Sequence, residues 1–243
     1  MTSFVANGHD VRLHVYEEPA DVPAGVTLVD AANVLPRSSL FLHARSASFA
    51  IFADWFRYKL LYEQGGLWVD TDVVCLRPFD HAHDEIYAWQ DERVINNAVL
   101  GLPRGHKLAA WMVECCERPN RWRPYDTVKI RRRKLLRRFR PGGGGQRIKW
   151  GESGPAGLTQ AARHLGCSEQ ALPFWHFYPI HYLNWRAVFD SSLRDNPQLV
   201  GASYGLHLWN EMARRHPGFD KNARSSADSL FEQLCARYLT NGS

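Results

Sequence analysis

The sequence predicts an alternating α/β fold, in which short strands come before and after a long helix. Residues 11–16 alternate between apolar and polar side chains, and residues 26–29 are rich in β-branched side chains, so both are expected to be strands. A helical pattern covers residues 46–64, and an apolar, Trp- and Val-rich strand is expected over residues 67–76. Strands and helices that alternate in this way are typical of α/β proteins.

The first long helix is the clearest element. Its apolar residues recur at steps of three and four, which marks one face: Phe49, Phe52, Ala53, Phe56 and Leu60. Gly65 and Gly66 then end the helix, because glycine readily adopts the left-handed conformation found at helix ends. Further helices are expected near residues 107–117, 157–165 and 226–239.

Length and composition fit one domain of 243 residues, with 45% hydrophobic and 23% charged side chains. The five cysteines form no C-x-x-C pair, so we expect neither structural zinc nor a disulfide framework, and a reducing cytosol is the natural location. No apolar run is long enough to span a bilayer, and the first ten residues lack the pattern of a signal peptide. These features predict a cytoplasmic protein.

The positive charge is confined to one segment. Residues 121–149 contain 12 Lys or Arg against one acid, Asp126, whereas the rest of the chain is net negative. Residues 129–140 are expected to form a cationic helix or a mobile loop, and four glycines follow Pro141. We interpret residues 121–149 as an insertion within a single domain that covers residues 1–243.

Asp70 and Asp72 form a D-x-D pair at the end of the expected strand 67–76. Alternate strand residues project to the same face, so the two carboxylates are expected side by side, with Thr71 turned away. A hard divalent ion such as Mn²⁺ or Mg²⁺ suits such a pair. Taken alone, the pair is weak evidence, because strand ends often carry acidic residues.

The residues around this pair resemble the sugar-binding region of D-x-D glycosyltransferases, above all the capsular-polysaccharide and α-1,4-glycosyltransferase group and more distantly the clostridial glucosylating toxins. The shared pattern is an Asp and an Arg three apart, a Tyr-rich helix end, two glycines, an aromatic residue and D-x-D, here Asp54, Arg57, Tyr58, Tyr62, Gly65, Gly66, Trp68, Asp70 and Asp72.

Three later segments extend the resemblance in the same order along the chain. They are an "N-A … G-H" element (Asn97-Ala98, Gly105-His106), a "G-P … L-T" helix start (Gly154-Pro155, Leu158-Thr159) and an "H-x-W-N" element (His207, Trp209, Asn210), which Phe177-Tyr178-Pro179 precedes. Four ordered motifs are more specific than one, and together they cover about residues 3–210.

The resemblance implies a single-domain GT-A fold, with a mixed, mostly parallel sheet flanked by helices. It implies a metal-dependent transferase that moves a sugar from a nucleotide-sugar donor, with UDP as the expected nucleotide, to a glycan or lipid-linked acceptor in surface polysaccharide synthesis. The group is mainly retaining, which implies an α-linkage, and no protein nucleophile is expected.

The resemblance also implies roles for individual residues. Asp72 and His207 would bind the metal, and Asp70 would contact the metal or the donor. Asp54, Arg57, Trp68, Gly154 and Pro155 would bind the donor, with Asn97 near its sugar, and Trp209 would donate its N–H to the leaving diphosphate. Each residue also has a structural reading: an ion pair for Asp54 and Arg57, core packing for the two tryptophans, and a helix start for Gly154-Pro155.

Proteins of this group begin with an additional strand that helps to bind the nucleotide base. Residues 2–9 of this chain correspond to the helix after that strand. We therefore expect the first strand and part of the base pocket to be missing, through truncation, a start assigned too late, or a loss of donor affinity.

The basic segment leaves other interpretations open. Its apolar side chains (Trp122, Ile130, Leu135, Leu136 and Phe139) fit docking on an anionic membrane surface, which would place the protein at the inner face of the membrane, whereas a solvated loop is the plainer reading. Two rival functions remain: a non-catalytic or remnant nucleotide-sugar-binding domain, because of the short N-terminus, and a less favoured nucleic-acid-binding protein, because of the arginine cluster.

Overall fold

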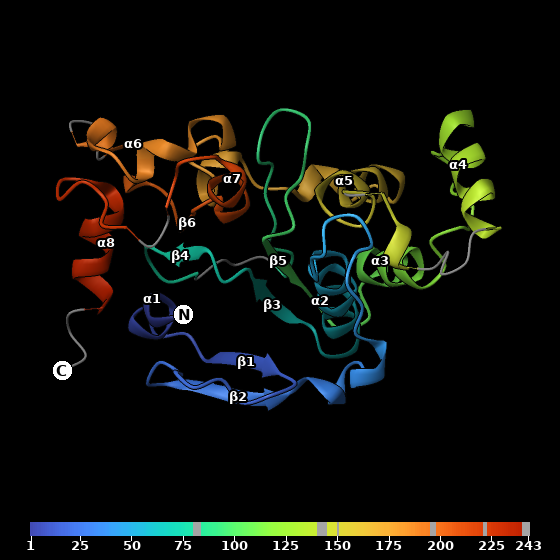
Figure 1. Cartoon of the computed structure of the whole chain (residues 1–243), viewed down its shortest axis with the longest axis horizontal. Helices are drawn as coiled ribbons and strands as arrows, with labels where there is room; N and C mark the ends of the chain where they lie inside the picture. Colours follow the sequence, from blue (N-terminus) through green and yellow to red (C-terminus); the bar gives the residue numbers. More distant parts are fainter. Residues whose placement is uncertain (80–83, 140–144, 150, 195–197, 221–222, 240–243) are drawn as a thin grey trace. The chain divides into compact units, whose positions relative to one another are not determined.

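The computed structural model describes residues 1–79, 84–139, 145–149, 151–194, 198–220 and 223–239, and it shows a mixed α/β protein (Figure 1). The strands are β1 (Val11–Val15), β2 (Val26–Asp30), β3 (Gly66–Val69), β4 (Val73–Cys75), β5 (Val99–Leu102) and β6 (Gly205–His207). The α-helices are α1 (Thr2–Ala6), α2 (Ala50–Gln64), α3 (Lys107–Glu117), α4 (Val128–Arg138), α5 (Pro155–His164), α6 (Gln198–Gly201), α7 (Asn210–Arg215) and α8 (Leu230–Leu239). Short 3₁₀ turns join them, at Ala31–Asn33, Arg37–Ser39, Gly145–Arg147, Ser168–Gln170, Phe174–His176, Tyr182–Val188 and Ser191–Leu193.

The chain folds into two compact units, each assembled from separate stretches of sequence. The first comprises Met1–Val29, Val69–His81 and Leu172–Ser243, and the second comprises Asp30–Trp68 and Ala82–Ala171. Because neither unit is one continuous segment, the chain crosses between them repeatedly. The interpretation of residues 1–243 as a single domain stays a prediction.

In the first unit, β4 and β6 pair antiparallel, with Val73 opposite His207 and Cys75 opposite Gly205. Helix α1 contacts both β4 and α8. A small core lies beside the β4–β6 pair, and its buried residues are Ile180, Val188, Leu206 and Leu234. This pairing brings the segment after D-x-D against a segment from the far end of the chain.

In the second unit, α2 packs extensively against α3, and α3 packs against α5. The buried face of α2 differs partly from the expected one. Phe52 and Phe56 are buried as predicted, but Phe49 is exposed, and Tyr58 and Leu61 complete the buried face. The main core includes side chains from α2, β5, α3 and α5, namely Tyr58, Leu61, Leu100, Leu102, Leu108, Met112 and Leu158.

Gly65 ends α2 as expected, with φ of 72° in the left-handed region. A side chain at this position would also be obstructed, because a Cβ atom would lie 2.7 Å from the backbone nitrogen of Arg104. The turn therefore needs glycine both for its conformation and for the close approach of a neighbouring backbone.

The sheet differs from the one that the resemblance implies. The described residues form three two-stranded sheets, β1–β2, β3–β5 and β4–β6, and not one mostly parallel sheet. The expected single strand over residues 67–76 is also wrong, because it is interrupted: β3 ends at Val69, a turn follows at Thr71 and Asp72, and β4 begins at Val73. The D-x-D pair therefore lies in a turn.

Candidate functional site

The first candidate cluster is built by the turn between β3 and β4 together with strand β6. The Val73 N–H donates a hydrogen bond to the carbonyl of Asp70 at 3.0 Å, which closes the turn around the D-x-D residues. One possible ligand atom from each of Asp70, Asp72 and His207 lies within 4.8 Å of the others. The three residues that the resemblance assigns to the metal are thus brought together, although a turn, and not a strand face, does this.

Asp72 is fixed on three sides. Its Oδ2 accepts a hydrogen bond from the Asn210 N–H at 2.9 Å, and its Oδ1 lies 3.3 Å from Nε2 of His207. Its backbone carbonyl accepts from the Leu208 N–H at 2.9 Å. Burial acts most strongly on this group and opposes its charge, but His207 and the Asn210 N–H together outweigh burial and lower the pKa of Asp72. The carboxylate is therefore held in place and ionised.

His207 is buried beside this carboxylate at the end of β6. Its ring lies edge-on to Trp209, with centroids 4.2 Å apart, and edge-on to Tyr178. Its Nδ1 is buried, and no hydrogen-bond partner for it is found among the residues that the structure describes. A buried polar atom that is left unsatisfied costs free energy and is most often retained where a site needs it.

This donor set suits a divalent cation. Two carboxylates and one imidazole provide oxygen and nitrogen ligands with at least one fixed negative charge, and Mn²⁺ accepts both kinds of ligand more readily than Mg²⁺ does. The ionised state of Asp72 and the position of Nε2 of His207 beside it agree with that use.

Trp209 does not fit the role that the resemblance implies. Its indole N–H already donates to the backbone carbonyl of Ile180 at 2.8 Å, in a buried position, so it is not available to a leaving diphosphate in this structure. Its backbone is left-handed, with φ of 53°, a conformation that costs a residue with a side chain roughly 1–3 kcal/mol. Trp209 therefore supports the ring of His207 and the start of α7.

Replacing Trp209 by Phe is expected to lower the free energy of unfolding by about 1–3 kcal/mol, because the Ile180 carbonyl loses its partner and the ring loses volume. Urea denaturation measures this loss. If the N–H instead served a bound diphosphate, stability would be unchanged and the affinity for UDP would fall. The conservative exchange Tyr182→Phe, beside the same ring, is the control.

The second candidate cluster lies in the other unit, around Asp54 on α2. Asp54 Oδ1 accepts from Nδ2 of Asn97 at 2.8 Å, and Oδ2 accepts from the Ser153 hydroxyl at 2.9 Å. Arg57, one turn further along α2, lies 3.9 Å from Asp54 and donates to the backbone carbonyl of Asn97. The structure therefore brings Asp54, Arg57 and Asn97 together. The ion pair between Asp54 and Arg57 is one part of this larger network.

Tyr58 is the member of this cluster for which the sequence analysis assigned no role. Its hydroxyl donates to the Ser153 carbonyl at 2.8 Å and accepts from Nδ2 of Asn97 at 3.1 Å. Burial, and then the charge of Asp54, raise the pKa of Tyr58 well above its ordinary value, so the hydroxyl stays protonated. The sequence did contain a signal for this position: Tyr58 follows Asp54 by four residues, and residues four apart on a helix share a face.

Gly154, Pro155 and Trp68 lie around the same cluster. A Cβ atom on Gly154 would lie 3.4 Å from Oδ2 of Asp54, so glycine leaves room for that carboxylate. Pro155 is the first residue of α5, as expected for a helix start. Trp68 is half-buried at the edge of the main core, with the Arg57 guanidinium 5.0 Å from its ring centre. Their contacts with a donor remain predictions.

Two family models match the chain, one after the other. Residues 20–91 match the glycosyltransferase sugar-binding region containing the DXD motif, and residues 146–241 match the α-1,4-glycosyltransferase conserved region. The chain is therefore similar to D-x-D α-1,4-glycosyltransferases in both segments. The first match contains Asp54, Trp68 and the D-x-D residues, and the second contains Gly154 and His207. Asn97 and helix α4 lie between the two matches.

Named α-1,4-glycosyltransferases are similar to most of the chain. A lactosylceramide 4-α-galactosyltransferase of Mus musculus is 29% identical over 202 residues, which cover 77% of this chain and 47% of the relative. An α-1,4-N-acetylglucosaminyltransferase of Homo sapiens is 25% identical over 202 residues, which cover 77% of this chain and 50% of the relative. The chain thus spans about half the length of these relatives. No solved structure matches it significantly.

Proposed function

We propose that this protein is a metal-dependent glycosyltransferase that moves a sugar from a nucleotide-sugar donor, with UDP as the nucleotide, to a glycan or lipid-linked acceptor. The observation that carries the proposal is the convergence of Asp70, Asp72 and His207, which lie up to 137 positions apart in sequence, in a chain that matches the D-x-D family model. The names of the two relatives describe transfer of galactose and of N-acetylglucosamine, and these names support a hexose as the transferred group.

In this proposal Asp72 and His207 bind the cation directly, and Asp70 contributes a third ligand or contacts the donor. A bound Mn²⁺ would neutralise the negative charge that develops on the diphosphate as the sugar–phosphate bond breaks. The Asn210 N–H keeps the Asp72 carboxylate in one orientation and favours its ionised form. The protein therefore provides a preorganised anionic site.

For the cluster around Asp54, we propose contacts with the donor's ribose, sugar hydroxyls or phosphate. Ser153 and Asn97 each donate to one carboxylate oxygen of Asp54, which fixes its plane while leaving its remaining lone pairs able to accept hydrogen bonds. Arg57 is held by its own hydrogen bond to the Asn97 carbonyl. A rigid acceptor beside a fixed cation suits recognition of sugar hydroxyls.

The fold that goes with this function is the single-domain GT-A type, and the products are α-linked with retention of configuration. Support comes from the relatives, whose names specify α-1,4 transfer, and from the mixed α/β content of both units. The D-x-D residues follow directly after the end of β3, and α/β proteins bind their ligands at the carboxyl ends of strands.

Isothermal titration calorimetry with UDP tests the proposal most directly. We expect UDP to bind in the presence of Mn²⁺ and the affinity to fall by at least about tenfold after treatment with EDTA, because the cation links the diphosphate to the carboxylates. Adding Mn²⁺ back restores binding if the loss is specific. UDP binding that is unaffected by EDTA would rule out the metal-dependent site.

A panel of nucleotide sugars then separates an enzyme from a binding remnant. An active transferase hydrolyses its own donor slowly in the presence of Mn²⁺ and without any acceptor, and the donor that is consumed identifies the transferred sugar. UDP binding with no donor consumed across the panel would favour the non-catalytic alternative.

A further inference from the structure

Helix α4 (Val128–Arg138) is amphipathic in the reverse of the usual sense. A surface helix normally turns its apolar face to the core and its charges to water. Here Lys134 and Arg137 are buried, whereas Val128, Leu135 and Leu136 are exposed, as is Phe139 immediately after the helix. The helix also lies between the two segments that match the family models.

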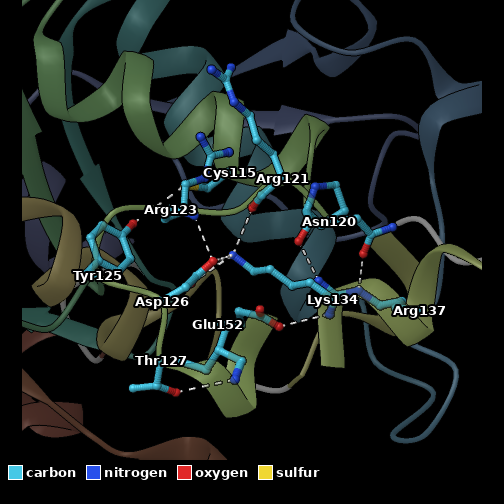
Figure 2. A network of polar contacts seen from close by, with 12 residues as sticks. Cys115, Asn120, Arg121, Arg123, Tyr125, Asp126, Thr127, Lys134, Arg137 and Glu152 are labelled. Atoms are coloured by element: carbon cyan, nitrogen blue, oxygen red, sulfur yellow. Dashed lines mark hydrogen bonds and ion pairs between the residues drawn. The ribbon is translucent and has the colours of Figure 1, made fainter. Parts of the chain in front are cut away.

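The buried cations have structural partners (Figure 2). The Lys134 ammonium donates to both oxygens of Asp126, at 2.7 and 3.0 Å, and to the Arg121 carbonyl at 3.1 Å. Arg137 pairs with Glu152 at 3.0 Å and also donates to Asn120 and to the Pro119 carbonyl. These charges are neutralised inside the protein, so they fix the orientation of α4 and are not available to a partner.

The opposite face of the helix combines apolar and cationic side chains. Val128, Leu136 and Phe139 are 66%, 63% and 79% exposed. Together with Arg132 and Leu135 they follow a spacing of four, seven, eight and eleven residues from Val128, which places them in one stripe. Lys129, Arg131 and Arg138 are exposed around this stripe. An exposed apolar stripe with a cationic border marks an interaction surface.

Trp122 extends this surface. It is half-exposed, and the Arg131 guanidinium lies 5.6 Å from its ring centre. An indole ring has an apolar body and one polar N–H, and such rings are enriched at the boundary between lipid and water.

We infer that the outward face of α4, made of Val128, Lys129, Arg131, Arg132, Leu135, Leu136, Arg138 and Phe139, docks the protein on the surface of a bilayer that contains anionic lipids. Its aliphatic and phenyl groups enter the boundary between headgroups and acyl chains, and its cations contact lipid phosphates. This docking does not depend on the proposed transferase activity. Among the described residues, no helix is long and apolar enough to cross a membrane.

Other occupants fit this surface less well. A second copy of the chain would bring the same four exposed cations, Lys129, Arg131, Arg132 and Arg138, against each other, and the repulsion would oppose association. Nucleic acid would pair with those cations and could stack on Phe139 and Trp122, but it would leave the aliphatic side chains of Val128, Leu135 and Leu136 exposed to water. An anionic lipid surface satisfies both the charge and the apolar side chains.

Co-sedimentation of the full chain with vesicles tests this inference. We expect binding to vesicles of phosphatidylcholine mixed with phosphatidylglycerol, and little binding to phosphatidylcholine alone. Lys129→Gln with Arg132→Gln should weaken the partition coefficient by about tenfold or more, since each cation near an anionic surface contributes roughly 1 kcal/mol. Leu136→Ser with Phe139→Ser should weaken it by a similar factor.

Matched controls keep the test specific. Arg104→Gln with Arg118→Gln removes two exposed cations elsewhere, and Leu42→Ser with Leu183→Ser removes two exposed leucines, so both double variants should bind vesicles like the wild type. Circular dichroism verifies that every variant is folded. Undiminished binding of both α4 double variants to the anionic vesicles would overturn the inference. So would a result in which a labelled single-stranded RNA binds the chain through Lys129 and Arg132 while neither kind of vesicle binds it.

Discussion

Replacing Asp72 by Asn is expected to abolish the Mn²⁺-dependent binding of UDP and to lower kcat/KM for transfer by about 100-fold or more. The amide has nearly the same size and can still accept the Asn210 N–H, so the turn between β3 and β4 should persist. The substitution removes the negative charge that a cation needs, and it also removes the attraction between this position and His207. Calorimetry with UDP and a transfer assay measure the two effects.

The control for this substitution is Asp228→Asn, which changes the same chemical group in an exposed ion pair with Arg194. It should leave UDP binding and transfer unchanged. Equal thermal unfolding of Asp72→Asn and wild type would separate a loss of metal binding from a loss of folding. If Asp72→Asn bound UDP in the presence of Mn²⁺ with the affinity of the wild type, the proposed role of Asp72 in holding the cation would be wrong.

Replacing Lys134 by Met should lower the free energy of unfolding by about 3–5 kcal/mol, the largest stability effect that we expect in this chain. The side chains of Lys134 and Asp126 are only 6% and 3% exposed, and their closest atoms are 2.7 Å apart. Removing the ammonium leaves the Asp126 carboxylate buried without its opposite charge, which is far more costly than losing the pair as a whole. Urea denaturation provides the measurement.

The double variant Lys134→Met/Asp126→Leu should recover most of this loss, because neither member of the pair then remains as a buried charge without its partner. The exposed pair Arg194–Asp228, at 3.1 Å, provides the comparison, and Arg194→Met should cost less than about 1 kcal/mol. Similar losses for Lys134→Met and Arg194→Met would contradict the conclusion that α4 is anchored by its cations.

The sequence and its resemblance pointed to the residues of the candidate metal cluster but not to the way in which they meet. The alternation of a strand was expected to align Asp70 and Asp72, yet the structure has a turn at that point. Strand patterns are set by side chains such as Val69 and Val73, and they carry little information about a break of three residues between them. The convergence of His207 came only from the resemblance, because no local pattern encodes a contact over that sequence distance.

The roles of polar side chains in hydrogen-bond networks were harder to predict. Trp209 was matched to a motif position, but the partner of its N–H is the carbonyl of Ile180, and a backbone acceptor leaves no trace in the sequence. Tyr58 was part of a recognised motif, yet its link to Ser153 depends on how α2 packs against a distant loop. A residue's place in a motif therefore indicated which residues lie near one another, but it did not indicate which hydrogen bond each polar atom makes.

For the basic segment, a helix was one of two expected structures, and the direction of its faces was not predicted. Charge counting treated all 12 cations of residues 121–149 alike. Burial divides them: Arg123, Lys134 and Arg137 are inside, paired with Glu114, Asp126 and Glu152. Arg140, Pro141 and the glycines at 142–144 lie outside the described residues. Only tertiary packing decides which charges remain for a partner, so composition overestimates the charge available at this surface.

The hydrogen bond between Asp72 and Asn210 joins residues 138 positions apart, and it bears on how the protein is made. During synthesis both D-x-D carboxylates leave the ribosome long before β6 exists, and closing so long a loop is entropically costly. The emerging chain therefore carries its two acidic residues without the imidazole and the backbone N–H that complete their surroundings. The proposed cation site would therefore be completed late, when His207 and Asn210 arrive, and a chain that terminates before β6 would keep the D-x-D pair and lack the partners that complete the site.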